Sequence, residues 1–194
     1  MIDIYVLGFP RSGTSLMSHI LTKMGCDFTH NNETIDDIYP TELNKNGYYQ
    51  RKDLHLMLFN LGLNDFNFGK KIQKSTICTE FIKILQKIKS TSKLIAIKEP
   101  YLLHILPTIL EFSDPFIILM IRNPKDVIKS CNTFLETINS DAVVTYEEWI
   151  LYHVEFMKLS STMRYIVIDY DDLIDNNDEI CCMLLSLFPN LKIL

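Results

Sequence analysis

The sequence contains no uninterrupted apolar segment of the roughly 18 residues that a membrane-spanning helix requires. The first apolar run begins at Ile2, which leaves no room for a signal peptide ahead of it, so we expect none. Basic residues form no stripe along the chain, and the net charge of −5 argues against nucleic acid as the main partner. These absences predict a protein that binds neither membranes nor nucleic acids.

The cysteines lack both the spacing of a metal site and the spacing of a disulfide framework. The five are Cys26, Cys78, Cys131, Cys181 and Cys182. We therefore expect no bound metal and a reducing, cytoplasmic location. With 194 residues, 47% of them apolar, the chain is long enough for a full core, and we expect one domain over residues 1–194.

Short apolar runs rich in Ile alternate with helical patterns along most of the chain. Such runs are typical of strands buried on both faces of a parallel sheet. The predicted strands are Ile2–Leu7, Lys93–Ile97, Phe116–Ile121 and Tyr165–Ile168. The predicted helices are Ser15–Met24, Asp53–Leu61, Ser75–Ile88, Tyr101–Phe112, Pro124–Asn139, Tyr146–Ser160 and Asp171–Phe188.

This alternation predicts an α/β fold, a three-layer sandwich with a central parallel sheet. The segment from Cys26 to Lys74 interrupts it, because it is polar and rich in Asn, Asp and Gly. Ligands of open α/β sheets bind beyond the carboxyl ends of the strands, so we expect this insertion to cover the site and shape the acceptor pocket.

The segment Gly8–Ser15 joins the first strand to the first helix and has the spacing of a phosphate-binding P-loop. Its glycines permit a tight turn, and the helix N-terminus presents N–H groups to an anion. Thr14 replaces the lysine of nucleotide-hydrolysing P-loops, and the strong cation is Arg11, inside the loop. The loop, with the N–H groups of residues 12–15 and the hydroxyls of Thr14 and Ser15, therefore predicts binding of a phosphate-like group. The alternative is a glycine-containing turn that merely begins a helix.

A second motif lies at the end of the third predicted strand. Arg122 leaves that strand, and Ser130 lies two turns into the following helix. Both side chains could reach one anion at the carboxyl edge of the sheet. A lone arginine at a strand end is more often a structural salt-bridge partner, but its combination with the first loop favours ligand binding.

Together these motifs resemble the two donor-binding motifs of sulfotransferases that use 3′-phosphoadenosine 5′-phosphosulfate (PAPS). Weaker matches accompany them: the segment 44–50, Lys98-Glu99-Pro100, and the segments 146–149 and 168–173. The resemblance implies a P-loop NTPase-like fold. It also implies that the first loop (Arg11, Ser12, Gly13, Thr14 and Ser15) holds the 5′-phosphosulfate, while Arg122 and Ser130 hold the 3′-phosphate.

Further expectations follow from this resemblance. The acceptor would be a hydroxyl of a carbohydrate or small molecule, and the protein a monomer or homodimer. Transfer of a loosely bonded SO₃ unit requires mainly positioning and charge stabilisation, which Arg11 can supply without a metal. Lys98 is a second candidate cation, with a surface lysine as the alternative reading.

The general base is the weakest point of the resemblance. The family pattern has glutamate where this sequence has Gln50, and an amide cannot take a proton at neutral pH. Candidate replacements are Glu99, Asp53, Glu42 and Glu33, of which we favour Glu99 because it ends a central strand. An ion pair of Glu99 with Lys98 or Arg11 is the alternative. His30 and His55, which lie within this insertion, merit more attention than the other histidines.

Two other functions remain open from the sequence. One is a nucleotide-dependent kinase, against which Thr14 and the absence of a convincing Walker-B carboxylate both argue. The other is a non-catalytic sulfotransferase-like nucleotide-binding protein, which Gln50 keeps open.

Overall fold

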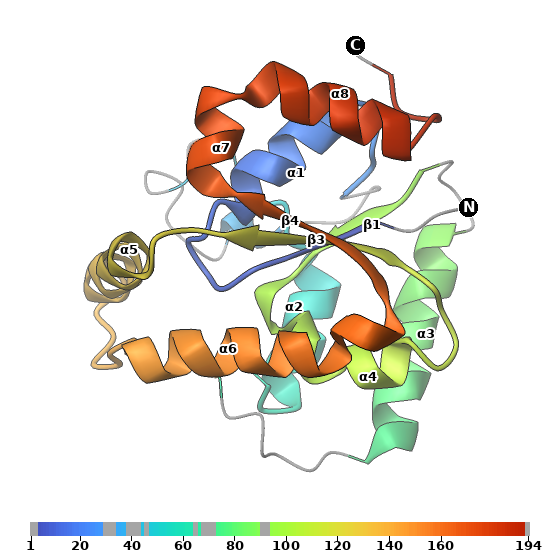
Figure 1. The fold of residues 1–194 in the computed structure, drawn as a ribbon. Helices are drawn as coiled ribbons and strands as arrows, with labels where there is room; N and C mark the ends of the chain where they lie inside the picture. The colour runs from blue at the N-terminus through green and yellow to red at the C-terminus, as the bar shows by residue number, and fades with distance from the viewer. Residues whose placement is uncertain are drawn as a thin grey trace.

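The computed structural model describes residues 4–28, 34–37, 44, 47–63, 66, 73–89 and 94–192 (Figure 1). These residues form a four-stranded parallel sheet in the order β2-β1-β3-β4. Its strands are β1 (Ile4–Leu7), β2 (Ala96–Lys98), β3 (Phe116–Ile121) and β4 (Arg164–Asp169). All four predicted strands are therefore present.

Helices cover both faces of this sheet and make three layers (Figure 1). One face carries α1 (Thr14–Lys23), α7 (Tyr170–Asp175) and α8 (Asn177–Leu187). The other face carries α2 (Lys52–Asn60), α3 (Lys74–Lys89), α4 (Leu106–Ile109) and α6 (Tyr146–Leu159). Short 3₁₀ helices span Ile35–Asp37, Pro100–His104 and Ser160–Thr162. The predicted α/β sandwich with a central parallel sheet is confirmed.

Helix α5 (Pro124–Thr137) stands apart from both layers, beside the carboxyl end of β3 (Figure 1). Asn123 caps it by accepting a hydrogen bond from the Lys125 N–H, and Pro124 occupies its first turn, where a missing N–H costs nothing. The helix therefore borders the edge of the sheet at which ligands of this fold class bind.

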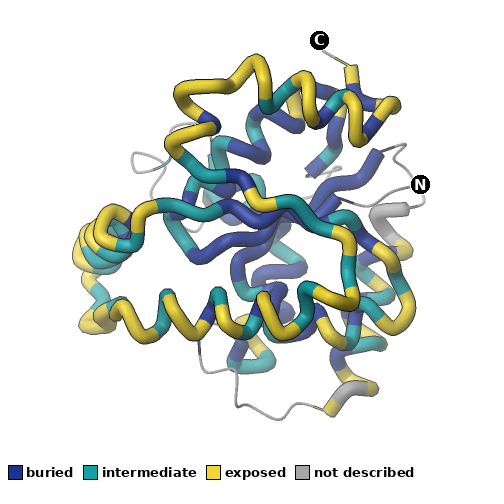
Figure 2. Tube along the Cα trace, in the orientation of Figure 1, coloured by how far each residue is buried: buried dark blue, intermediate teal, exposed yellow. Residues whose placement is uncertain are grey.

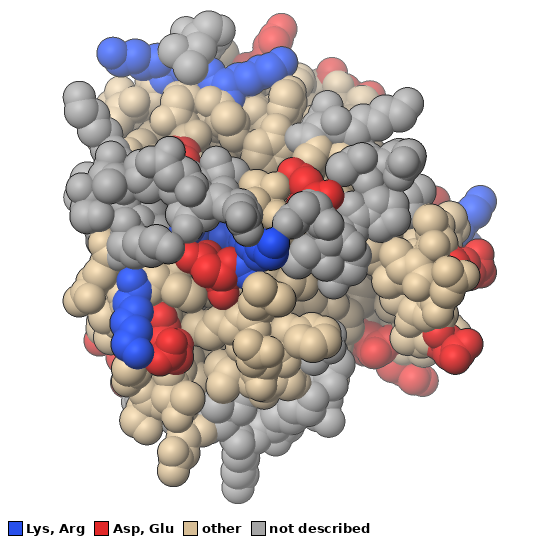
Figure 3. All heavy atoms as spheres, turned by 180° about the vertical axis from the view of Figure 1, so that it is seen from behind, with Lys and Arg blue, Asp and Glu red and all other residues tan. Residues whose placement is uncertain are grey.

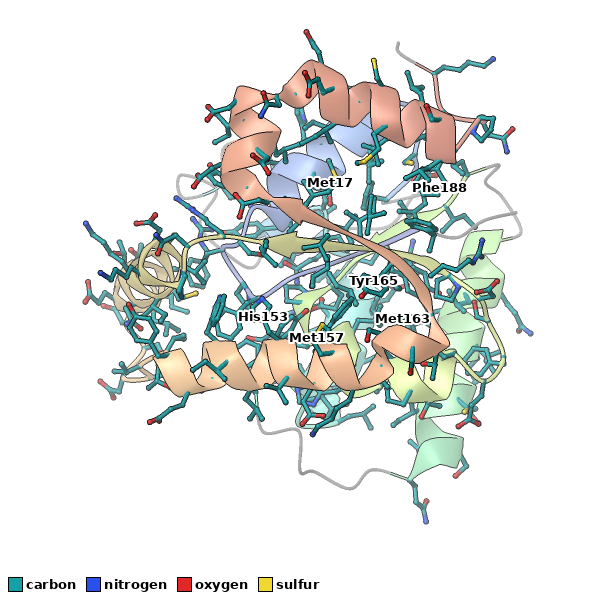
Figure 4. All side chains as sticks on the ribbon, in the orientation of Figure 1. Met17, His153, Met157, Met163, Tyr165 and Phe188 are labelled. Carbon is teal, nitrogen blue, oxygen red and sulfur yellow. The ribbon has the colours of Figure 1, made fainter. Side chains whose placement is uncertain are left out.

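Successive side chains of a strand point to opposite faces of the sheet, so the core consists of two clusters, one on each face. In β1, Tyr5 and Leu7 belong to the cluster on the α2–α6 side, and Ile4 and Val6 to the cluster on the α1–α8 side. Figure 2 shows the buried strands at the centre of the molecule. In Figure 4, the side chain of Met17 lies on the α1–α8 side of the sheet and Tyr165 on the α6 side.

Three expectations about these elements are wrong. Strand β4 is not buried on both faces: it is an edge strand, and its Val167 is 47% exposed. The helix predicted over residues 101–112 is instead a 3₁₀ helix followed by α4, because Pro107 cannot donate the backbone hydrogen bond that a continuous helix needs. The helix predicted over 171–188 breaks at Asn176, whose φ of −125° is not helical.

Candidate functional site

The loop after β1 is a strained turn. Gly8, Arg11 and Gly13 have φ angles of 153°, 70° and 97°, and a non-glycine residue rarely adopts the value of Arg11. A Cβ on Gly8 would lie 2.5 Å from Ser12 Oγ and 2.7 Å from the Met120 carbonyl oxygen. The Ser12 N–H closes the turn by donating to the Phe9 carbonyl at 3.1 Å. Strain of this kind is kept where function requires it.

The turn leads directly into the N-terminus of α1. Gly13 is its N-cap and supplies no side-chain cap, so the N–H groups of the first turn are presented at the loop. Gly13 also packs against Tyr170 at the start of α7, since an added Cβ would lie 2.4 Å from the ring carbon Cδ2. The helix end is therefore open for an anion.

The second predicted motif meets this loop. Arg11 Nε donates to Ser130 Oγ at 3.0 Å, and Arg122 Nη1 donates to the Arg11 carbonyl oxygen at 3.4 Å. The Arg122 guanidinium lies over the Tyr170 ring, 4.2 Å from its centroid. The buried Arg122 Nε has no hydrogen-bond partner among the described residues. The structure thus brings Arg11, Arg122 and Ser130 together, as the sequence predicts.

Lys98, at the carboxyl end of β2, is buried behind the loop. Its Nζ donates at 2.8 Å both to the Tyr48 carbonyl and to Gln50 Oε1, and lies 3.4 Å from Ser15 Oγ. Burial, with a smaller contribution from the Arg11 charge, lowers the pKa of Lys98 from 10.5 to about 7, although Glu99 acts in the opposite direction. The lysine is therefore not at the surface and is poised to change charge near neutral pH.

Glu99 follows β2, which is an edge strand of the described sheet and not the central strand that we expected. Its side chain is nevertheless completely buried and forms a compact hydrogen-bond network. Its Oε2 accepts a hydrogen bond from Gln50 Nε2 at 2.9 Å and lies 3.2 Å from His55 Nδ1. Its Oε1 accepts from the Tyr101 N–H at 3.2 Å, which caps the 3₁₀ helix 100–104. In the part of the chain that the structure describes, Glu99 forms no ion pair with Lys98 or Arg11, and its hydrogen bonds orient the side chains that surround it.

The other carboxylates proposed as the base differ in position. Asp53 pairs with Arg51 at 2.7 Å, at the start of α2. Glu33 and Glu42, like His30, lie outside the described residues. Among the alternatives that the structure describes, Asp53 is therefore a less suitable base than the groups around Glu99, because it is paired with Arg51 and does not line the cavity.

These groups surround a cavity of about 390 Å³. Arg11, Lys98 and Arg122 line it, and no described lining residue is acidic. The predicted residues Gly13, Thr14, Ser15 and Ser130 also line it, whereas Ser12 and Glu99 lie behind the wall. The described part of the segment 26–74 contributes Ile35, Asn44, Tyr48, Gln50, His55 and Phe66.

Arg11, Lys98 and Arg122 place positive charge in this cavity. In Figure 3, the Lys and Arg side chains of the described residues on the visible face are dispersed among acidic and uncharged ones. A cavity whose charged lining residues, among those described, are Arg11, Lys98 and Arg122, at an open helix end, suits a multiply charged anion.

Comparison with protein families identifies the chain. A family model described as the sulfotransferase family matches residues 3–188. The chain belongs to the sulfotransferase family. Membership supports sulfuryl transfer as the activity of the protein.

The other comparisons add little information about the function of this sulfotransferase. A search of curated proteins found no match. Two solved structures of deoxyadenosine kinase from M. mycoides are similar. The one with bound dATP is 14% identical, covers 96% of this chain and 99% of the kinase, and has a TM-score of 0.49. The one with bound dCTP is 15% identical, covers 95% and 100%, and has a TM-score of 0.48. No described helix has the length and apolar character to cross a bilayer.

Sequence reasoning assigned no role to two tyrosines beside the loop. Tyr170 lines the cavity and contacts Gly13 and Arg122, one residue from each motif. Tyr152 is not among the lining residues, but its hydroxyl oxygen accepts a hydrogen bond from the Gly8 N–H at 3.0 Å. Tyr170 follows directly on a strand, a position that could have singled it out. Tyr152 lies in a helix 144 residues from Gly8, with no local signal.

Proposed function

We propose that this protein transfers the sulfuryl group of PAPS to a hydroxyl of a carbohydrate or small-molecule acceptor. The observation that carries the proposal is the cavity in which Arg11, Lys98 and Arg122 gather without a described carboxylate. A donor with phosphate groups at two positions needs cations at two positions, and the two arginines come from separate motifs. Membership of the sulfotransferase family supports the same reaction.

The proposal assigns the loop to the reacting end of the donor. The N–H groups at the start of α1 and the hydroxyls of Thr14 and Ser15 would hold the 5′-phosphosulfate. Arg11 would neutralise charge on the leaving phosphate and the sulfuryl oxygens, with Lys98 as the second cation. The Ser12 backbone would help by holding the turn that shapes this end of the site.

The second motif would hold the 3′-phosphate. Arg122 is oriented by the Tyr170 ring and the Arg11 carbonyl, so its guanidinium is fixed in place before a ligand binds. A 3′-phosphate would pair with its unsatisfied Nε–H. Ser130, already bonded to Arg11, would connect the two phosphate sites.

Thermal unfolding in the presence of adenosine 3′,5′-bisphosphate (PAP), ADP or ATP–magnesium tests this function. PAP at 100 times its dissociation constant should add about 2.7 kcal/mol of stability. For a domain of this size the melting temperature should rise by about 5–10 °C. The proposal would be contradicted if the melting temperature rose with ATP–magnesium alone or if it rose with none of the three ligands.

Two variants sharpen the test. Arg122→Met should abolish most of the PAP-induced rise, because it removes the cation assigned to the 3′-phosphate. Arg164→Met is the matched control: it also removes one arginine, but from the opposite end of the sheet, where Arg164 pairs with Asp114 at 2.8 Å. The control should keep the full rise.

A further inference from the structure

Gln50 occupies the position of the expected general base, and the structure fixes it as a bridge. Its Oε1 accepts from Lys98 Nζ, and its Nε2 donates to Glu99 Oε2. The Lys98 ammonium can only donate and the Glu99 carboxylate can only accept, so the amide atom facing Lys98 is the oxygen and the one facing Glu99 is the nitrogen. An amide held in this way cannot remove a proton from an acceptor hydroxyl.

His55 is a titratable side chain beside this bridge and, like Lys98, it lines the cavity. It comes from α2, inside the segment that we expect to shape the acceptor pocket, and only 6% of it is exposed. Gln50, whose Nε2 lies 3.5 Å from His55 Nδ1, lines the cavity too. Because His55 comes from the segment expected to shape the acceptor pocket and from neither phosphate-binding motif, the acceptor would lie beside it.

Glu99 selects the tautomer of His55. The carboxylate oxygen Oε2 lies 3.2 Å from His55 Nδ1 and can only accept, whereas the donor Gln50 Nε2 is farther from the same nitrogen, at 3.5 Å, so we assign the proton to Nδ1. The basic lone pair of the ring is then on Nε2. The carboxylate itself is held by Gln50 and by the Tyr101 N–H, so it cannot turn away from the ring.

We infer that His55 is the general base of this enzyme and that Glu99 is its positioning residue. This inference rests on the proposed sulfuryl transfer. His55 Nε2 takes the proton of the acceptor hydroxyl as the acceptor oxygen forms its bond to sulfur. The bond between sulfur and the 5′-phosphate oxygen breaks, and PAP leaves with that electron pair. The products are a sulfate ester, PAP and a His55 imidazolium paired with Glu99.

The same network couples the base to the donor loop. From His55 it runs through Glu99, Gln50 and Lys98 to Ser15. The positive charge that develops on the imidazole at one end is stabilised by the Glu99 carboxylate. The negative charge on the sulfuryl oxygens at the other end is stabilised by Lys98. The expected Glu at position 50 is thus replaced by a neutral bridge that joins two charged groups.

The kinetic test measures sulfuryl transfer from PAPS to phenol and to p-nitrophenol. His55→Asn should lower the rate with phenol about 10²- to 10⁴-fold, the usual contribution of a general base. The loss should be much smaller with p-nitrophenol, which ionises near neutral pH without help. Added imidazole should restore part of the phenol rate. Equal losses with both acceptors, or no loss, would overturn the inference.

His153→Asn is the matched control. His153 lies in α6, donates through Nδ1 to the Trp149 carbonyl oxygen and is not among the residues that line the cavity. It should leave both rates unchanged. His55→Asn should keep the PAP-induced rise in melting temperature, which shows that the donor site is intact. If the wild-type protein shows no such rise, the proposed function fails, and with it this inference.

A second measurement needs no acceptor. Nitrogen-15 NMR of the imidazole should show protonated Nδ1 and unprotonated Nε2 in neutral His55. Glu99→Gln should weaken that preference and lower the turnover number while leaving the KM for PAPS nearly unchanged, and Glu99→Asp should recover part of the turnover. A wild-type His55 protonated at Nε2 would overturn the assignment.

Discussion

Arg11 and Ser130 are 119 residues apart in the sequence, and their side chains are joined by a 3.0 Å hydrogen bond from Nε to Oγ. Arg11 belongs to the loop after β1, and Ser130 belongs to α5, the helix beside the carboxyl end of β3. The bond fixes the long side chain of Arg11, whose backbone has an unusual φ of 70°. It therefore orients the loop cation before a ligand arrives.

Ser130→Ala should weaken PAP binding by about tenfold or more, because a hydrogen bond to a charged group contributes about 1.5–3 kcal/mol. Isothermal titration calorimetry would measure the change. Ser186→Ala, which removes an exposed hydroxyl from α8, is the control and should bind PAP normally. Equal affinities of Ser130→Ala and wild type would show that Arg11 is oriented without Ser130.

The pair Gly13 and Gly25 separates backbone strain from crowding. Both have a φ of 97°, but a Cβ on Gly13 would lie 2.4 Å from the Tyr170 ring, whereas a Cβ on Gly25 would meet no described atom within 4 Å. Gly25→Ala should cost about 1 kcal/mol from strain alone. Gly13→Ala should cost more and also reduce PAP binding, because Tyr170 must move away from Arg122.

Urea unfolding of the two variants would measure this difference. The double variant Gly13→Ala with Tyr170→Ala should recover part of the extra loss, since the crowding is gone. If the two single variants lose equal free energy of unfolding, the close packing of Gly13 against Tyr170 contributes nothing to stability.

Lys98 should make stability depend on pH in an unusual direction. Its pKa is about 7 when folded and 10.5 ordinarily, so between these values the unfolded chain binds more protons than the folded one. Stability contributed by this group therefore rises with pH across that window, by up to about 1.4 kcal/mol per pH unit. Lys98→Met should lack this rise, and Lys83→Met, an exposed lysine of α3, should keep it. Parallel pH profiles of wild type and Lys98→Met would contradict the prediction.

Binding of PAP should also change the charge of Lys98. An anion beside the lysine raises its pKa above about 7, so the complex takes up protons at neutral pH. Calorimetry at pH 7.5 in two buffers with different ionisation enthalpies would detect this uptake. Lys98→Met should show none, and uptake that survives in this variant would place the titrating group elsewhere.

Much of the fold was predictable because its signals are local. The Ile-rich runs identified all four strands, and the spacing of Gly8, Gly13 and Ser15 identified the loop. The errors arose where tertiary context decides: β4 is exposed because it lies at the edge, and Asn176 breaks a helix that the apolar pattern continues through.

The network beside the loop was not predictable for a different reason. His55 and Glu99 are 44 residues apart, on α2 and at the end of β2, and no periodicity relates them. The sequence could show that Gln50 is a poor base and that Glu99 ends a strand. Only the packing of α2 beside β2 shows that Glu99 is fully buried and that His55 faces the cavity in its place.

Gln50→Glu tests whether the expected base position retains its usual role. In the structure this residue faces Lys98 at 2.8 Å and Glu99 at 2.9 Å. A glutamate there would pair with Lys98 and repel Glu99, so it would not be available to an acceptor. We expect no gain in the rate of sulfuryl transfer to phenol and a lower thermal stability than Gln50→Met, which places no new charge there. A rate increase of tenfold or more would assign the base to position 50, with the natural glutamine limiting turnover.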